Sequence, residues 1–330
     1  MGDRRALVTS QLARGEPVDV DQVRGVDTAT MTSLLGELGL PRETVDELRG
    51  HWDEMRRSTP WSSLLATMVA SVERDRGHID TPLVVFDDFD DHGTSGRLIA
   101  FYLFALQYEG LRTYHQRLGV PEDVSLATAR ALARHAETHR LKHATTGIDA
   151  AWWMQTVLRG EILQVGSLKF HHFRLGVSTL SPRPWLDEAE IVRLGEGFRH
   201  GDFALGVHIP ARVDLSRPAL DATFERARDV ITRVWPSPSR RVATCQSWMM
   251  DERLGAALGD DSNIVGFQRR FALIDPFDDD EGMVRYFVFG PREGAAEPVT
   301  ASRLQRVVGD VLSRGERWHN RTGWLEFDSR

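Results

Sequence analysis

The hydrophobic pattern of the chain changes at about residue 160, and this change constrains the fold more than any other feature. Before it, apolar residues recur at helical spacing, as Leu64, Leu65 and Met68 do. The run 97–119, RLIAFYLFALQYEGLRTYHQRLG, is strongly apolar and predicts a central helix. Pro41 stands where a proline can begin a helix. The first part therefore predicts an all-helical domain.

Beyond this point the residues are typical of β-strands separated by helices. Strands are expected at 161–170, 203–210, 240–246, 267–277 and 283–290, and helices at 149–160, 219–235, 249–259 and 302–315. This order predicts an α+β protein, in which an all-helical domain at 1–147 precedes a mixed α/β domain at 148–330.

The net charge and the composition of the chain limit the kinds of molecule that it is expected to bind. The chain has 41 Lys and Arg against 48 Asp and Glu, a formal charge of -7. Nucleic-acid binders usually carry a basic excess, so a small molecule or a protein is the expected partner. A single cysteine excludes an internal disulfide. No segment reaches the ~18 to 20 apolar residues of a membrane span, and we expect a cytoplasmic protein of unspecified oligomeric state.

Three segments of the second half resemble a known family. They are WWMQTVLRGEILQVGSLKF (152–170), GVHIP (206–210) and CQSWMMDERLGAALGDDSNIVGFQRRFAL (245–273). Together they resemble bacterial acyltransferase-domain proteins, which join a helical N-terminal domain to a domain similar to the GNAT N-acyltransferases. The resemblance implies a GNAT-like second domain, acyl-coenzyme A (acyl-CoA) as co-substrate and transfer of its acyl group to an amine.

The resemblance also indicates where the donor would bind. GNAT enzymes hold acyl-CoA where two parallel strands separate, and a glycine-rich loop at a helix N-terminus binds the pyrophosphate. The equivalent segment here, ARVDLSRPALD (211–221), contains no glycine. Arg212, Ser216 and Arg217 are then the candidate cofactor-binding residues. The missing pattern leaves open another acyl carrier or a loss of catalysis.

Two residues are candidates for the chemical step. His208 lies near the end of a predicted strand, where an imidazole could take a proton from the attacking amine. Cys245 is the alternative, a nucleophile a few residues before a helix. Direct acyl transfer needs no covalent enzyme intermediate, so a packing role for Cys245 competes with this interpretation.

Several polar residues near the same strands are candidate ligands. Ser247 is a candidate catalytic residue or a helix cap, Gln246 and Asn263 could contact the donor, and Trp248 could line the substrate pocket. If 161–170 and 267–277 are strands, Gln164 and Gln268 could line one face and bind substrate. Glu161 and Lys169, at the ends of the first of these strands, are expected in solvent.

No metal is expected. His135, His139 and His143 recur every four residues on one helical face, but HAETHRLKH lacks the HExxH arrangement and a solvated basic face is the simpler interpretation. The acidic run 87–93, DDFDDHG, does not match a calcium-binding loop.

These features predict an N-acyltransferase that moves an acyl group from a thioester donor to the amine of a small molecule. The alternatives are a catalytically silent GNAT-like binding protein and acyl transfer from a carrier protein or an aminoacyl-tRNA. A hydrolase that uses Cys245 is a third possibility.

Overall fold

The computed structural model describes residues 18–83, 93–179, 184–237, 241–279, 281–289 and 302–328. The chain divides after Gln164 into two compact units, Met1–Gln164 and Val165–Arg330. This division differs from the boundary expected near residue 147, because the helix at Ala151–Leu158 packs into the core of the first unit through Met154 and Val157.

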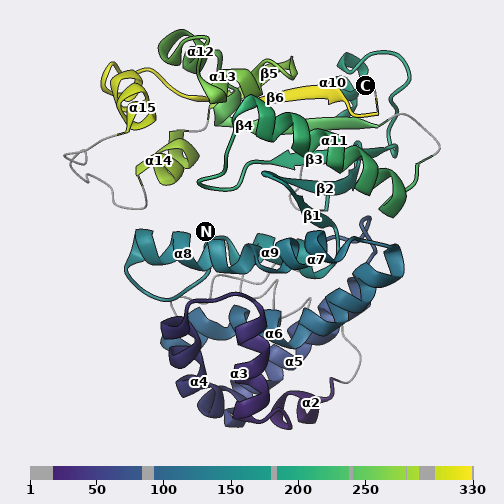
Figure 1. Cartoon of the computed structure of the whole chain (residues 1–330), viewed down its shortest axis with the longest axis vertical. Helices are drawn as coiled ribbons and strands as arrows, with labels where there is room; N and C mark the ends of the chain where they lie inside the picture. Colours follow the sequence, from purple (N-terminus) through teal and green to yellow (C-terminus); the bar gives the residue numbers. More distant parts are fainter. Residues whose placement is uncertain are drawn as a thin grey trace. The chain divides into compact units, whose positions relative to one another are not determined.

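The described part of the first unit is built of helices, apart from the start of one strand (Figure 1). They are α2 (Val20–Arg24), α3 (Thr28–Glu37), α4 (Arg42–Arg57), α5 (Thr59–Asp75), α6 (Gly93–Leu118), α7 (Glu122–Ala129), α8 (Ala131–His143) and α9 (Ala151–Leu158). Local sequence sets several of their ends: the Asp27 side chain accepts a hydrogen bond from the Thr30 amide at 2.7 Å and caps α3. The prediction of an all-helical N-terminal domain is confirmed.

The apolar helix expected at 97–119 is α6, and it lies at the centre of this unit's core. On α6, Tyr102 lies 4.9 Å from the ring of Trp52 on α4, and its hydroxyl donates to the carbonyl oxygen of Leu48 at 2.8 Å. Burial raises the pKa of Tyr102, so the phenol stays protonated and keeps this hydrogen bond. None of the described helices has the length and apolar character needed to cross a membrane.

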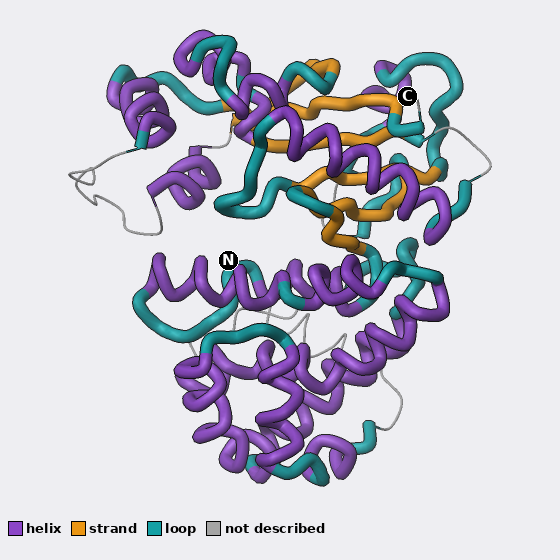
Figure 2. The backbone as a smooth tube through the Cα atoms, viewed as in Figure 1, coloured by secondary structure: helices purple, strands orange, loops and turns teal. Residues whose placement is uncertain are grey.

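The second unit is organised around a mixed six-stranded sheet, drawn in orange in Figure 2. The strands are β1 (Ile162–Val165), β2 (Leu168–Arg174), β3 (Phe203–His208), β4 (Val242–Ser247), β5 (Ala272–Asp279) and β6 (His319–Glu326), in the order β1-β2-β3-β4-β6-β5. Strands β3 and β4 are parallel, whereas β2 with β3, β4 with β6 and β5 with β6 are antiparallel.

The described helical segments of this unit are α10 (Glu188–Arg193), α11 (Arg217–Val234), the 3-10 turn η2 (Trp248–Met250), α12 (Glu252–Leu258), α13 (Asn263–Gln268), α14 (Glu281–Phe289) and α15 (Arg303–Ser313). Two of them cover opposite faces of the sheet. Helix α11 connects β3 to β4 and packs on one face, where Phe224 meets Phe170 of β2 at 6.0 Å. On the other face, Ile191 of α10 shares an apolar cluster with Phe173 and Val242. The prediction of a helical region followed by a mixed α/β domain is confirmed.

Some local predictions differ from the structure. The strand expected at 161–170 is a hairpin, because Gly166 takes a positive φ of 54° and turns the chain between β1 and β2. The segment expected as a strand at 283–290 forms α14, in which Val284 and Val288 face one apolar cluster at helical spacing. The strand β6 was not predicted.

The hairpin also corrects the environment of two charged residues. Glu161 and Lys169 are buried, with only 2% and 3% of their surfaces exposed, although solvent was expected for both. Inside the protein Glu161 lies beside a cationic side chain, with Arg159 Nε 2.7 Å from Glu161 Oε1.

Two buried histidines predict that the protein loses stability in mild acid. Burial, reinforced by Arg76, lowers the pKa of His115 to about 4, and burial among other cationic groups lowers the pKa of His172 to about 3. Both start from 6.5, so between pH 6.5 and these values the unfolded chain binds protons that the folded chain does not. The contribution of these two histidines to the free energy of unfolding is fully present above pH 6.5. At lower pH it decreases, by up to about 1.4 kcal/mol per pH unit for each histidine.

Urea unfolding at a series of pH values measures this loss. His172 stacks between Phe203 and Trp235, at 4.8 Å and 4.6 Å, so His172→Phe can retain the packing without the titrating group. We expect this variant to lose less stability between neutral pH and pH about 4 than the wild type. His51→Phe, at an accessible position on α4, is the control, and its free energy of unfolding should change with pH as that of the wild type does. If the stability of His172→Phe changed with pH as much as that of the wild type, His172 would not contribute to the acid sensitivity.

Candidate active site

The parallel strands β3 and β4 separate at their carboxyl ends. Their paired residues run from Ala204 with Val242 to Gly206 with Thr244, and both strands continue beyond this last pair. The pairing of β3 with β2 and of β4 with β6 continues further: Lys169 of β2 pairs with His208, and Arg321 of β6 pairs with Ser247. The ends of β3 and β4 therefore form an opening in the sheet at which an extended ligand could add hydrogen bonds to the strands.

The register shows which side chains share a face at this opening. Paired residues of neighbouring strands point to the same side, and alternate residues of one strand do so as well. His208 and Gln246 therefore lie on one face, together with Lys169, His171 and Thr244. The structure brings the predicted base and one predicted donor contact to the same face of the same opening.

His208 sits in an aromatic environment on this face. Its half-buried ring lies 5.6 Å from the ring of His171 and 5.6 Å from Trp185, which meets it edge-on. Burial lowers the pKa of His208 well below its usual value, and His171 and Lys169 add to this effect. The imidazole is therefore neutral at neutral pH, which is the form that can accept a proton.

Cys245 occupies the opposite face of β4. Its register partner is Gly323 of β6, and only 1% of its surface is exposed. Burial raises the pKa of the thiol to about 12, so almost no thiolate exists at neutral pH. The geometry therefore argues against the catalytic and hydrolase interpretations of Cys245 and fits a packing role.

Ser247 and Trp248 have structural partners where β4 ends. The Ser247 hydroxyl accepts a hydrogen bond from the Met249 amide at 3.1 Å and caps η2. Trp248 packs against the apolar cluster that contains Leu254 and Trp318. Neither contact places these residues on the face of His208.

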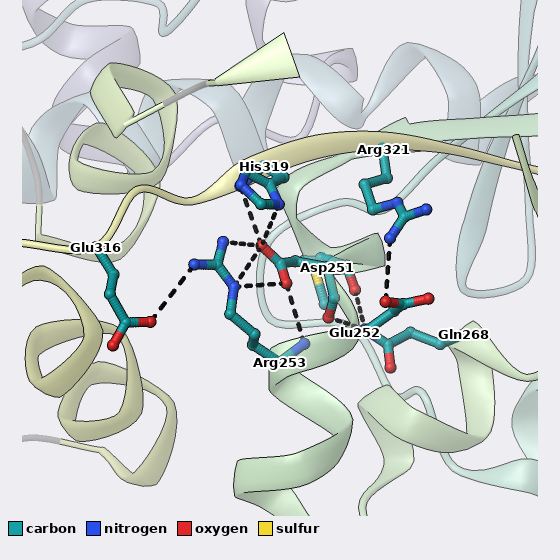
Figure 3. A network of polar contacts seen from close by, with 8 residues as sticks. Asp251, Glu252, Arg253, Gln268, Glu316, His319 and Arg321 are labelled. Atoms are coloured by element: carbon teal, nitrogen blue, oxygen red, sulfur yellow. Dashed lines mark hydrogen bonds and ion pairs between the residues drawn. The ribbon is translucent and has the colours of Figure 1, made fainter. Parts of the chain in front are cut away.

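A buried carboxylate fixes the segment that follows β4 (Figure 3). Asp251 accepts hydrogen bonds from the amides of Arg253 and His319, both at 3.0 Å, and pairs with the Arg253 guanidinium. Its own burial raises the pKa of Asp251, but the hydrogen bonds from Arg253 and His319 outweigh burial and lower it. Asp251 thus ties β6 to the start of α12.

Gln268, predicted to bind substrate from a strand, belongs instead to the end of α13 and to this same network. Its amide donates to the carbonyl oxygens of Met249 at 2.6 Å and Asp251 at 3.0 Å (Figure 3). Asn263 begins the same helix. Gln164, on β1, accepts a hydrogen bond from Arg134 at 2.7 Å. The two glutamines therefore each have their own local partners and do not form the shared lining that was expected.

The three candidate cofactor-binding residues lie where predicted, between β3 and α11. Arg212 is exposed and takes a positive φ of 60°. Ser216 is the N-cap residue of α11, but its hydroxyl makes no capping hydrogen bond. Arg217, 90% exposed, lies 3.8 Å from Asp221, a surface pair that holds it only weakly. The N-terminus of α11 thus presents two arginines near the end of β3.

The three histidines of α8 have local contacts. His135 Nδ1 lies 2.8 Å from the Asp149 carbonyl oxygen, and His139 Nδ1 lies 3.1 Å from that of Thr145. His139 also stacks on His143 at 4.4 Å and is buried, which corrects the expectation of a wholly solvated face. Across the described ranges, no group of three or more His, Cys, Asp or Glu is placed to hold a metal ion. Residues 87–92 of the acidic run lie outside the described residues.

The sequence did not identify the neighbours that give His208 its environment. Lys169 and His171 follow the turn at Gly166, and their facing depends on treating 168–174 as a second strand. Trp185 comes from the segment before α10, a helix that was not predicted. The alternation of KFHHF after a glycine was the signal that could have placed both β2 residues beside His208.

Solved structures similar to this chain include acyltransferases. The chain is similar to an acyltransferase in complex with decanoyl-CoA, with 24% identity over 99% of this chain and 96% of that chain and a TM-score of 0.77. It is similar to a tryptophan-to-alanine mutant of an acyltransferase in complex with octanoyl-CoA, with 24% identity, the same coverage and a TM-score of 0.81. A complex of an acyltransferase with decanoyl-CoA and teicoplanin shares 25% identity, again over 99% and 96% of the two chains, with a TM-score of 0.78.

Two family models match consecutive parts of the chain. The model described as N-acyltransferase N-terminal domain matches residues 29–160, and the model described as GNAT-like C-terminal domain matches residues 162–325. No curated protein is similar enough to the chain to count as a match. The chain therefore belongs to the acyltransferases that combine an N-acyltransferase N-terminal domain with a GNAT-like C-terminal domain.

Proposed function

We propose that the protein transfers an acyl group from acyl-CoA to the amine of a small molecule at the opening between β3 and β4. The observation that carries this proposal is the separation of these parallel strands beside a neutral His208. The backbone groups of the strand ends can bind the extended thioester arm, and the imidazole can accept a proton there.

The proposed reaction is a direct transfer. The amine nitrogen attacks the thioester carbonyl carbon, the N–C bond forms, and backbone N–H groups at the opening stabilise the oxyanion. His208 takes the proton from the attacking nitrogen. The C–S bond then breaks, and coenzyme A leaves as a thiol once the proton returns to its sulfur. No covalent enzyme intermediate is needed, in keeping with the burial of Cys245.

Two features support the choice of donor and acceptor. The arginines at the N-terminus of α11, Arg212 and Arg217, can bind the phosphates of coenzyme A through their side chains, although the usual glycine-rich loop is missing. Similar structures contain decanoyl-CoA, and one also contains teicoplanin. A medium-chain acyl group and an amine on a glycopeptide-like acceptor are therefore the first pair to test.

Titration calorimetry with decanoyl-CoA and release of free thiol in the presence of teicoplanin test the proposal. We expect binding, thiol release and an acylated acceptor by mass spectrometry. The double variant Arg212→Ala/Arg217→Ala should weaken coenzyme A binding about tenfold or more, since each charged hydrogen bond contributes about 1.5 kcal/mol or more. Arg226→Ala/Arg233→Ala, farther along α11, is the matched control and should leave binding unchanged.

Two outcomes would count against the proposal. Failure of the wild type to bind any acyl-CoA would favour a carrier-protein or aminoacyl-tRNA donor. Tight binding without thiol release, for a panel of amines, would favour a catalytically silent binding protein.

A further inference from the structure

Gly206 is a glycine inside a strand, in the sequence FALGVH of β3. Its backbone conformation does not require glycine, because its φ lies outside the left-handed region that other residues avoid. A glycine in the interior of a strand offers no side chain for packing, and it often marks a place where another group approaches the backbone closely. The space around Gly206 shows which groups do so.

Two histidines occupy the space that a side chain at position 206 would need. A Cβ atom there would lie 3.3 Å from Nε2 of His208 and 3.8 Å from its Cε1. It would also lie 3.4 Å from Cβ of His171. The His208 imidazole therefore folds back along its own strand and lies over residue 206, where no side chain displaces it.

His171 limits how the chain could make room at this position. It is the register partner of Gly206 on β2, and directly opposite residues of antiparallel strands have Cβ atoms about 4.5 to 5.5 Å apart. Here only 3.4 Å would separate the two Cβ atoms. Because His171 lies in the middle of β2 and is buried, a side chain at position 206 could not move toward it. The imidazole of His208 would have to move instead.

Gly206 also lies at the inner end of the opening between β3 and β4. It pairs with Thr244 of β4 in the last registered pair before the two strands separate. The ring of His208 thus lies over the point at which the opening begins, and its Nε2 is shielded from solvent there.

We propose that Gly206 is a positioning residue for His208. The missing side chain lets the imidazole lie back over β3 at the start of the opening, in the place from which it accepts the proton of the attacking amine. The inference rests on the proposed acyl transfer. It predicts that a single methyl group at position 206 impairs catalysis through His208 and not through the fold.

The kinetics of Gly206→Ala test this role. We expect kcat to fall about tenfold, because a small displacement of a catalytic group has an effect of this size, and KM to change little. A double-mutant cycle isolates the cause. In the His208→Ala background no imidazole is left to displace, so Gly206→Ala should lower kcat no further. An equal loss with and without His208 would overturn the inference.

A titration followed by NMR tests the position of the ring without turnover. The His208 signal in histidine-labelled protein is identified by its loss in His208→Ala. Burial is the main cause of the lowered pKa of His208, so a ring displaced toward solvent should have a pKa closer to its usual 6.5. The other side chains on this face near the ring are two that can carry charge, Lys169 and His171 of β2, and two that cannot, Trp185 and Gln246. None of them is altered in Gly206→Ala, so a rise in this pKa reports displacement of the ring. An unchanged chemical shift and pKa would contradict the proposal.

Thermal unfolding and a matched glycine separate positioning from a structural role. Any decrease in Tm caused by Gly206→Ala should be smaller in the His208→Ala background, where the crowding by the ring is absent. Gly266→Ala, at an exposed position of α13 with no neighbouring atom within 4 Å of the added Cβ, should leave kcat and the pKa of His208 unchanged. A lower Tm of Gly206→Ala with unchanged kcat and pKa would show a purely structural glycine and would overturn the inference. Absence of acyl transfer by the wild type would instead refute the proposed function, and the titration would still decide whether Gly206 sets the position of His208.

Discussion

Alanine in place of His208 is expected to lower kcat by about a hundredfold or more, the usual contribution of a positioned general base. The KM values of both substrates should change little, because the imidazole acts on the proton and not on the bound ground state. The reason lies in the surroundings of His208. Burial, His171 and Lys169 lower its pKa well below 6.5, so the ring stays neutral and able to accept a proton at neutral pH.

The same environment fixes the pH dependence. In the wild type, loss of His208 function by protonation requires a pH well below 6.5, so the rate between neutral pH and that range should follow the deprotonation of the acceptor amine. Added imidazole should partly restore the His208→Ala variant, which a purely structural role would not allow. His172→Phe, whose side chain lies on the opposite face of β2, serves as the control with near wild-type kcat. Unchanged turnover in His208→Ala would refute the assignment.

Methionine in place of Arg159 is expected to cost about 3 to 5 kcal/mol of unfolding free energy, the usual effect of removing one partner of a buried ion pair. Arg159 and Glu161 have side chains only 1% and 3% exposed, and their closest atoms are 2.7 Å apart. Arg159 also donates to the carbonyl oxygens of His78 at 2.6 Å and Thr81 at 2.8 Å. The variant leaves the carboxylate of Glu161 buried without this cation and removes both backbone contacts.

Equilibrium unfolding in urea measures this cost. The double variant Arg159→Met/Glu161→Leu should recover part of the loss, because no charge is then left inside. Arg233→Ala removes an exposed pair with Asp229 at 2.8 Å and should change stability by less than about 1 kcal/mol. Equal losses in the Arg159 and Arg233 variants would show that burial does not determine the effect.

The helical half of the fold and the β3–α11–β4 unit could be predicted from sequence. Their apolar residues recur over long windows, as on α6, and proline and glycine mark their ends. His208 could be placed at a strand end for the same reason, because Pro210 follows within two residues. These signals are local, and the tertiary structure did not override them.

Short apolar segments could not be assigned in the same way. The β-type residues of 283–290 predict a strand, yet α14 buries Val284 against the cluster that contains Trp318. Gln268 was placed on a strand that in fact begins at Ala272. The burial of Glu161 depends on Arg159, and composition alone cannot show that pairing. The positions of Arg134 and Gln164 likewise depend on helices that are distant in sequence from β1.

The early end of the β3–β4 pairing also has a mechanical consequence. Strand β3 stays paired with β2, and β4 stays paired with β6, up to the last residue of β3 and of β4. These two outer strands therefore keep the ends of β3 and β4 apart. If β2 or β6 shifted its register by one residue, every side chain of the shifted strand would point to the other face. The strand paired with it, β3 or β4, would shift as well. The distance between the ends of β3 and β4 is thus a property of the whole sheet. Residues of β2 and β6 that never contact a substrate can therefore still change the rate of turnover.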